Sequence, residues 1–161
     1  MNQEILKAKE AIVDEVVENI KNSQSVMIVE YRGLTVDETI NVRRALREVG
    51  ASMRVYKNSL VERAAEKLGH EDLKSMLQGP NAVVFSKDVI AGPKVVAKFA
   101  KKYENLVIKG GLAEGKVLNE SEMKSVAALP GREGLISMLL SCLQAPVRQF
   151  ACAVKAVADK N

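Results

Sequence analysis

The sequence is poor in aromatic residues and in cysteine. Tryptophan is absent and aromatic residues make up only 4% of the 161 residues, so the core has to be built from Val, Leu, Ile, Met and Ala. The two cysteines, Cys142 and Cys152, lie in one apolar helical stretch. Ten residues of helix rise about 15 Å, which is beyond the reach of a disulfide within that helix. We therefore expect both to be small buried hydrophobic residues in a reducing compartment.

The motifs of common catalytic and metal sites are also missing. There is no GxxxxGK[ST] or GxGxxG phosphate loop, no serine in a GxSxG setting, and no cysteine pair with zinc-ligand spacing. The single histidine, His70, lies between two predicted helices, where an exposed loop residue is a simpler interpretation than a general base. We predict a protein that is not an enzyme and has no cofactor, no metal ion and no small-molecule substrate.

Long apolar runs are scarce as well. Charged residues interrupt the N-terminal segment, and no uninterrupted stretch reaches the roughly 18 apolar residues of a membrane span. We expect a cytoplasmic protein that does not cross a membrane.

The sequence does contain a regular alternation of helix and strand patterns. Apolar spacings of three and four predict helices at 2–21, 35–49, 58–68, 71–77, 93–103 and 120–128. Thr35 followed by Glu38 is a capping box for the second helix, and Asn58 or Ser59 is expected to cap the third. Short apolar or alternating runs predict strands at 26–29, 52–57, 82–85, 106–108 and 116–118, with a turn at Gly110-Gly111 after the fourth. The pattern predicts an α/β domain at 1–129, a sheet flanked by helices, and leaves the strand order open.

A different pattern follows Pro130-Gly131. Residues 132–159 read as one long helix, with Pro146 expected to kink or break it. Apolar residues cover more than half of its surface, which favours a second region at 130–161 that binds another protein. Packing against its own domain and lying on a membrane surface are the two alternatives. The residues that we expect to contact the partner are Leu135, Ile136, Leu139, Leu140, Leu143, Val147, Phe150, Val154 and Val157.

The basic residues are unevenly distributed along the chain. The net charge is only +4, but six of the eight arginines lie between residues 32 and 63. Polar segments mark the ends of the first two strands, Tyr31-Arg32-Gly33-Leu34 and Arg54-Val55-Tyr56-Lys57-Asn58, and they would meet at one edge if these strands were parallel neighbours. Arginine can clamp a phosphate and tyrosine can stack on a base, which favours RNA binding. The alternatives are a solvated basic face, with Tyr31 covering the core and Asn58 capping a helix.

Five short motifs occur in a characteristic order: Tyr31-Arg32-Gly33-Leu34-Thr35, Val55-Tyr56-Lys57-Asn58-Ser59-Leu60, Gly79-Pro80-Asn81-Ala82, Ile108-Lys109-Gly110-Gly111 and Ala128-Leu129-Pro130. Together they resemble the bacterial family of the tenth large-subunit ribosomal protein, the base of the ribosomal stalk. The resemblance implies a domain that binds large-subunit ribosomal RNA. It carries over Tyr31, Arg32, Gly33, Lys57 and Asn58 as RNA contacts, and we add Lys7, Arg43 and Arg54 from their charge alone.

The resemblance also gives the C-terminal helix a role. In this family the helix holds dimers of the acidic stalk protein, and the segments 135–143 and 147–157 suggest two dimers here. The dimers recruit translational GTPases, so translation factors are indirect partners, and the eleventh large-subunit ribosomal protein is the expected neighbour. The alternative is a regulatory RNA-binding protein whose helix recruits some other protein.

Overall fold

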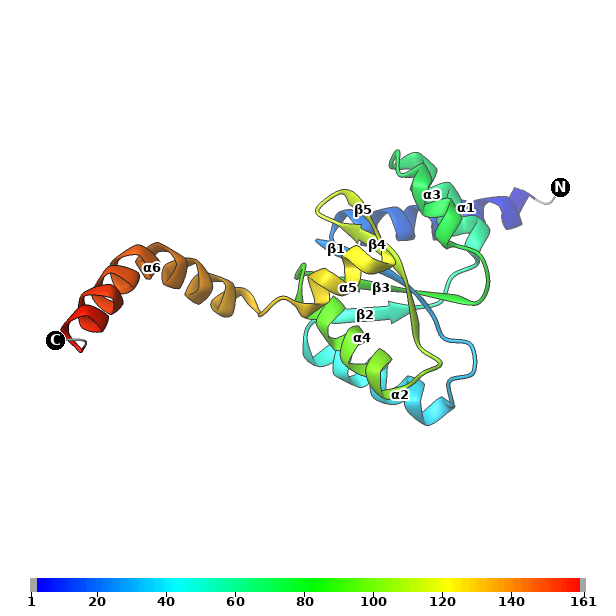
Figure 1. Cartoon of the computed structure of the whole chain (residues 1–161). Helices are drawn as coiled ribbons and strands as arrows, with labels where there is room; N and C mark the ends of the chain where they lie inside the picture. Colours follow the sequence, from blue (N-terminus) through cyan, green and yellow to red (C-terminus); the bar gives the residue numbers. More distant parts are fainter. Residues whose placement is uncertain (1–2, 160–161) are drawn as a thin grey trace. The chain divides into compact units, whose positions relative to one another are not determined.

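The computed structural model describes residues 3–159, apart from the side chains of residues 3–6, 71, 132 and 157. It confirms a mixed α/β fold followed by a long C-terminal helix (Figure 1). The elements are, in chain order, α1 (Gln3–Lys21), β1 (Ser25–Glu30), α2 (Val36–Glu48), β2 (Ala51–Arg54), α3 (Asn58–Lys67), the 3₁₀ helix η1 (Glu71–Met76), β3 (Asn81–Ser86), α4 (Ala91–Lys102), β4 (Val107–Ala113), β5 (Lys116–Asn119), α5 (Glu120–Ala128) and α6 (Arg132–Ala158).

The five strands form one sheet in the order β2-β3-β1-β4-β5, and every neighbouring pair is antiparallel. β1 and β2 are therefore not neighbours, because β3 lies between them. Both are antiparallel to β3, so they still run in the same direction. Two strand spacings of about 4.8 Å separate them. The turns after β1 and β2 thus lie at the same end of the sheet, although the adjacency that we considered is wrong.

Two helical layers cover the sheet, one on each face (Figure 1). Val16 of α1 and Ala64 of α3 pack with Val83 and Phe85 of the sheet in one core cluster. Leu46 of α2 and Met123 of α5 pack with other strand residues in the second cluster, which also takes in α4. The central strand β1 contributes alternate side chains to both clusters, which explains its unbroken apolar run.

The glycine pair at 110–111 lies inside β4 and is not the predicted turn. A Cβ atom on Gly111 would lie 2.1 Å from the carbonyl oxygen of Val26, and one on Gly110 would lie 2.7 Å from the carbonyl oxygen of Leu118. Glycine is required here because the neighbouring strands β1 and β5 approach the β4 backbone closely. β4 is consequently longer than the predicted strand at 106–108.

Two helix N-termini show how local sequence sets the element boundaries. Thr35 caps α2 with the predicted capping box, in which its side chain accepts from the Glu38 amide and Glu38 accepts from the Thr35 amide. The N-cap of α3 is Lys57, which makes no side-chain cap bond. Asn58 is already inside the helix, so the predicted asparagine or serine cap is wrong. β2 also ends earlier than predicted, and the Tyr56 ring leaves the strand to pack edge-on against Phe85, with 6.3 Å between ring centroids.

The chain divides into two compact units, one ending at Ala128 and the other beginning at Leu129. The second unit consists mainly of α6, which continues through Pro146 without a break in its helical assignment. Figure 1 shows the helix bending along its length, as expected when an internal proline removes one backbone hydrogen bond. Glu133–Ala156 is long and apolar enough, by length and composition, to cross a membrane, and none of it is buried.

Candidate nucleic-acid interface and partner-binding helix

Four separate segments meet at one end of the sheet, which we call the motif end: residues 31–34, 56–58, 78–81 and 105–109. β1 and β2 finish here, whereas β3 and β4 begin here, because Glu30 pairs with both Asn81 and Val107. The antiparallel register therefore gathers segments that lie far apart in the sequence, such as those that follow Glu30 and surround its partner Val107. Each of the first four motifs that carried the family resemblance contributes residues to this end.

The cationic side chains of Arg32 and Lys57 are exposed at the motif end. Neither forms an ion pair with any residue in the described part of the chain. Tyr31 is half-buried and packs against the core cluster of α2 and α4, so it does cover the core as one alternative supposed. Two exposed cations without an acidic partner among the described residues therefore lie at the same end of the sheet as a half-buried aromatic ring.

Side-chain amides fix the loops of the motif end. The Asn58 amide donates to the carbonyl of Gly79 at 2.8 Å, and the Asn105 amide donates to the carbonyl of Gly33 at 2.9 Å. Gly33 and Gly79 both have φ of +89°, a conformation that favours glycine. The sequence reasoning did not identify Asn105, because nothing in its local pattern links it to a loop 72 residues away.

Arg54 differs from the other candidate RNA contacts because its charge is already neutralised. Its guanidinium forms an ion pair with Glu15 of α1 and donates to the hydroxyl of Tyr56 at 3.3 Å. The hydrogen bond to Tyr56 is the main reason why the pKa of Arg54 is raised. Burial is the main reason why the pKa of Tyr56 is raised, and the hydrogen bond from Arg54 opposes it. The cluster ties β2 to α1 on the surface of the domain.

The remaining charged candidates lie on helices. Lys7 is exposed on α1 and Arg43 is exposed on α2, and neither is among the cations in the ion pairs described. Glu15 of α1 forms an ion pair with Arg54 at the end of β2, and Lys7 lies about two turns nearer the N-terminus of the same helix. Arg43 lies in the middle of α2, away from the loops.

α6 exposes almost all of its apolar side chains. Of the predicted partner contacts, Leu135 is half-buried, whereas Ile136, Leu139, Leu140, Leu143, Val147, Phe150 and Val154 are 50–73% exposed. The side chain of Val157 lies outside the described residues. Cys142 and Cys152 are exposed, so the expectation that they are buried is wrong. The physical reason is that no described residue of α6 belongs to either core cluster, so its apolar pattern does not lead to burial.

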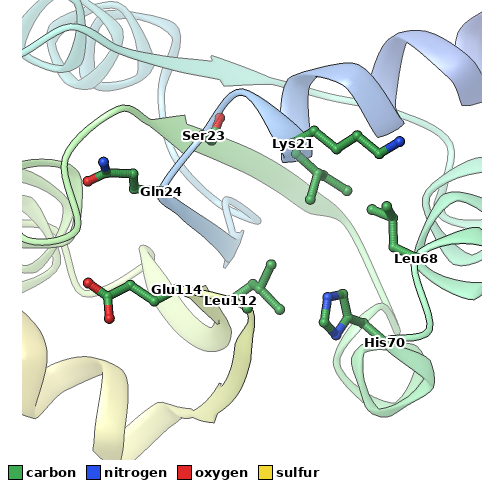
Figure 2. A pocket seen from close by; sticks show the side chains of 9 residues that line it. Lys21, Ser23, Gln24, Leu68, His70, Leu112 and Glu114 are labelled. Atoms are coloured by element: carbon green, nitrogen blue, oxygen red, sulfur yellow. The ribbon is translucent and has the colours of Figure 1, made fainter.

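A pocket of about 410 Å³ lies at the opposite end of the sheet from the motif end. Figure 2 shows the His70 ring near Leu68 and Leu112, with Gln24 and Glu114 across the hollow. His70 is half-buried here and is not the exposed loop residue that we expected. Within residues 3–159, no group of three or more His, Cys, Asp or Glu is placed to hold a metal ion. Ser23 also lines this pocket, and its hydroxyl donates to the carbonyl of Asn19 at 2.6 Å.

The architecture defines a class of protein, an α/β domain with exposed cations at one end of its sheet followed by a helix that exposes its apolar side chains. Residues 4–101 match the family model of ribosomal protein L10, and residues 129–161 match that of the ribosomal protein uL10 C-terminal region. Large ribosomal subunit proteins uL10 from Staphylococcus aureus strains JH9, Newman and N315 are each 52% identical over 158 residues, covering 98% of this chain and 95% of theirs.

The chain belongs to the ribosomal protein L10 family. Membership makes it a component of the large ribosomal subunit and places it in the bacterial cytoplasm. The family consists of ribosomal proteins and not of enzymes, which agrees with the prediction from the sequence.

Proposed function

We propose that the domain through Ala128 binds large-subunit ribosomal RNA with its motif end. The observation that carries this proposal is the convergence of four distant motif segments around the unpaired cations of Arg32 and Lys57. Exposed cations without acidic partners gain the most from phosphate neutralisation, because no ion pair has to be broken first. Arg32 can contact two phosphate oxygens at once, and Lys57 supplies a point charge.

The other candidates take graded roles in this proposal. Tyr31 presents part of its ring for stacking, and Gly33 allows the loop backbone to approach a phosphate closely. Lys7 extends the cationic surface along α1, and Arg43 lies further from the motif end on α2. Arg54 is the least favoured contact, since its ion pair with Glu15 would have to open.

We further propose that α6 anchors two dimers of the acidic stalk protein. Its apolar side chains are exposed on both sides of Pro146, which supports two successive binding segments. The match of residues 129–161 to the uL10 C-terminal region supports a ribosomal partner and not a membrane for this apolar helix. The dimers would recruit translational GTPases, and the eleventh large-subunit ribosomal protein is the expected neighbour of the RNA-bound domain.

The RNA-binding part is tested by the salt dependence of binding to large-subunit ribosomal RNA stripped of protein. Each phosphate contact contributes about 0.7–0.9 to the log–log slope. Arg32→Ala with Lys57→Ala should flatten the slope by about 1.4–1.8 and weaken binding. Lys87→Ala with Lys116→Ala removes the same charge from exposed lysines at the other end of the sheet, and should leave the slope nearly unchanged. Equal slopes for both double variants would place the RNA surface elsewhere.

The partner-binding part is tested by co-purification with the acidic stalk protein, with the mass of the complex measured by light scattering. The full chain should bind two dimers, whereas a chain ending at Pro130 should bind none. If both forms bind equally, the partner docks on the domain. If neither binds, α6 serves a different partner.

A further inference from the structure

Two glycine loops at the motif end are each held by an asparagine from a different part of the chain. Asn58 holds Gly79, and Asn105 holds Gly33, in both cases by donating a side-chain amide to the glycine carbonyl at 2.8–2.9 Å. The fit at Gly33 is close, since a Cβ atom there would lie 3.2 Å from the side chain of Asn105. The same hydrogen bond, from an asparagine side-chain amide to a glycine carbonyl, therefore occurs once in each loop.

A lysine at a strand irregularity makes a third contact between loops, and we call this contact and the two asparagine bonds the ties. In the β1–β4 ladder Ile28 pairs with Gly110 and Val29 pairs with Ile108, so Lys109 is the extra residue of a bulge. A bulge redirects a side chain from its regular place along the strand. The Lys109 ammonium lies 2.8 Å from the carboxylate of Glu30 and also donates to the carbonyl of Gln78.

The positive charge of Lys109 is therefore already paired with the carboxylate of Glu30. The Lys109 and Glu30 side chains are only 22% and 26% exposed, which makes this the least exposed of the ion pairs among the described residues. A phosphate could recruit this ammonium only by displacing a partly buried carboxylate, which would leave that carboxylate without its partner. Lys109 is thus unlike Arg32 and Lys57, which are exposed and have no acidic partner.

We propose that Asn58, Asn105 and Lys109 are positioning residues for RNA binding, which set the geometry of the Gly33 and Gly79 loops without contacting phosphates themselves. The inference rests on the proposed RNA-binding function and reassigns Asn58, which we expected to be a contact. Loops that are already ordered lose less conformational entropy on binding, so the ties raise affinity by preorganisation. The bonds to Gly33 and Gly79 also restrain the loop that carries Arg32 and the segment that carries Lys57.

This role has a distinctive signature in binding experiments. Removing one net hydrogen bond should weaken RNA binding by about 2- to 12-fold. The salt slope should stay constant, because no phosphate contact is lost. Arg32→Ala should instead lower the slope by about 0.7–0.9. A positioning residue and a contacting residue can therefore be distinguished even when their affinity losses are equal.

The experiment compares Asn58→Ala, Asn105→Ala and Lys109→Met in the full chain, with protein-free large-subunit ribosomal RNA as the probe. Asn22→Ala is the matched control, since Asn22 is exposed at the other end of the sheet. Affinity is measured across a salt series, and amide hydrogen exchange of the two loops is measured in the free protein. We expect faster exchange in the loop that each variant releases, a weaker affinity and an unchanged slope.

The possible results separate this inference from the function on which it rests. A slope that falls by one phosphate equivalent in Lys109→Met would make Lys109 a direct contact and overturn its positioning role. Unchanged affinity in all three variants would show that the ties do not shape the interface. Failure of the unchanged chain to bind the RNA would refute the proposed function instead. Should Lys109→Met not fold, Asn105→Ala still decides the matter, because it removes only one bond from an exposed residue.

Discussion

Replacing Leu139 by alanine should weaken the binding of an acidic stalk dimer while leaving the folded domain intact. The Leu139 side chain is 61% exposed on α6 and belongs to neither core cluster. Fully burying a leucine side chain contributes about 1.5–3 kcal/mol, and only the exposed part can be newly buried by a partner. The expected loss is therefore about 1–2 kcal/mol, or about a 5- to 30-fold higher Kd.

The measurement is isothermal titration calorimetry with the acidic stalk protein, accompanied by thermal unfolding of each variant. Alanine has the higher helix propensity, so loss of binding cannot be attributed to melting of α6. Gln144→Ala is the matched control, because five residues of helix place Gln144 about 140° around the axis from Leu139. Equal Kd values for the unchanged chain and Leu139→Ala would refute this reasoning, as would a loss of the same size in Gln144→Ala.

Two further predictions concern the domain itself. Gly111→Ala should lower the free energy of unfolding of the domain by about 3 kcal/mol, measured in urea. The new Cβ atom would lie 2.1 Å from the carbonyl oxygen of Val26, a backbone atom that cannot rotate away. A loss below about 0.5 kcal/mol would contradict the close approach of these strands. The Lys74 ammonium lies 2.7 Å from the Glu66 carboxylate, and its hydrogen bond lowers the pKa of Glu66. The stability that this pair contributes is therefore present above the ordinary carboxyl pKa. It is lost as the pH falls through the lowered pKa of Glu66. An NMR titration should show the Glu66 midpoint rising in Lys74→Gln, and an unmoved midpoint would remove Lys74 as the cause.

Local sequence patterns predicted most elements of the domain but not their arrangement. The capping box at Thr35 and the apolar run of β1 depend on residues within a few positions of each other, so both could be predicted from the local sequence. The insertion of β3 between β1 and β2 depends on pairing between distant segments. Gly110-Gly111 was misread as a turn for the same reason, since the close approach of two neighbouring strands leaves no mark in the local sequence.

At the motif end, too, some residues could be predicted from the local sequence and others could not. Its exposed cations, Arg32 and Lys57, were predictable because their residue types and neighbours suggest solvent and phosphate. The amide of Asn105 and the ammonium of Lys109 act through carbonyl groups on other loops. Such bonds depend on backbone oxygens, which every residue possesses, so no residue type identifies the acceptor beforehand. Exposure of Cys142 was missed because an apolar pattern alone does not show whether a helix meets a core.

No described residue of α6 belongs to either core cluster, so under the proposed function the fold of the domain and the number of bound dimers depend on different parts of the chain. Adding or deleting helical turns after Pro130 would change no residue of either core cluster. Under the proposed function, a lineage could therefore change how many dimers each ribosome carries by changing the length of one helix. Such a change needs no compensating substitutions in the domain, so selection can adjust the copy number of the partner independently of RNA recognition.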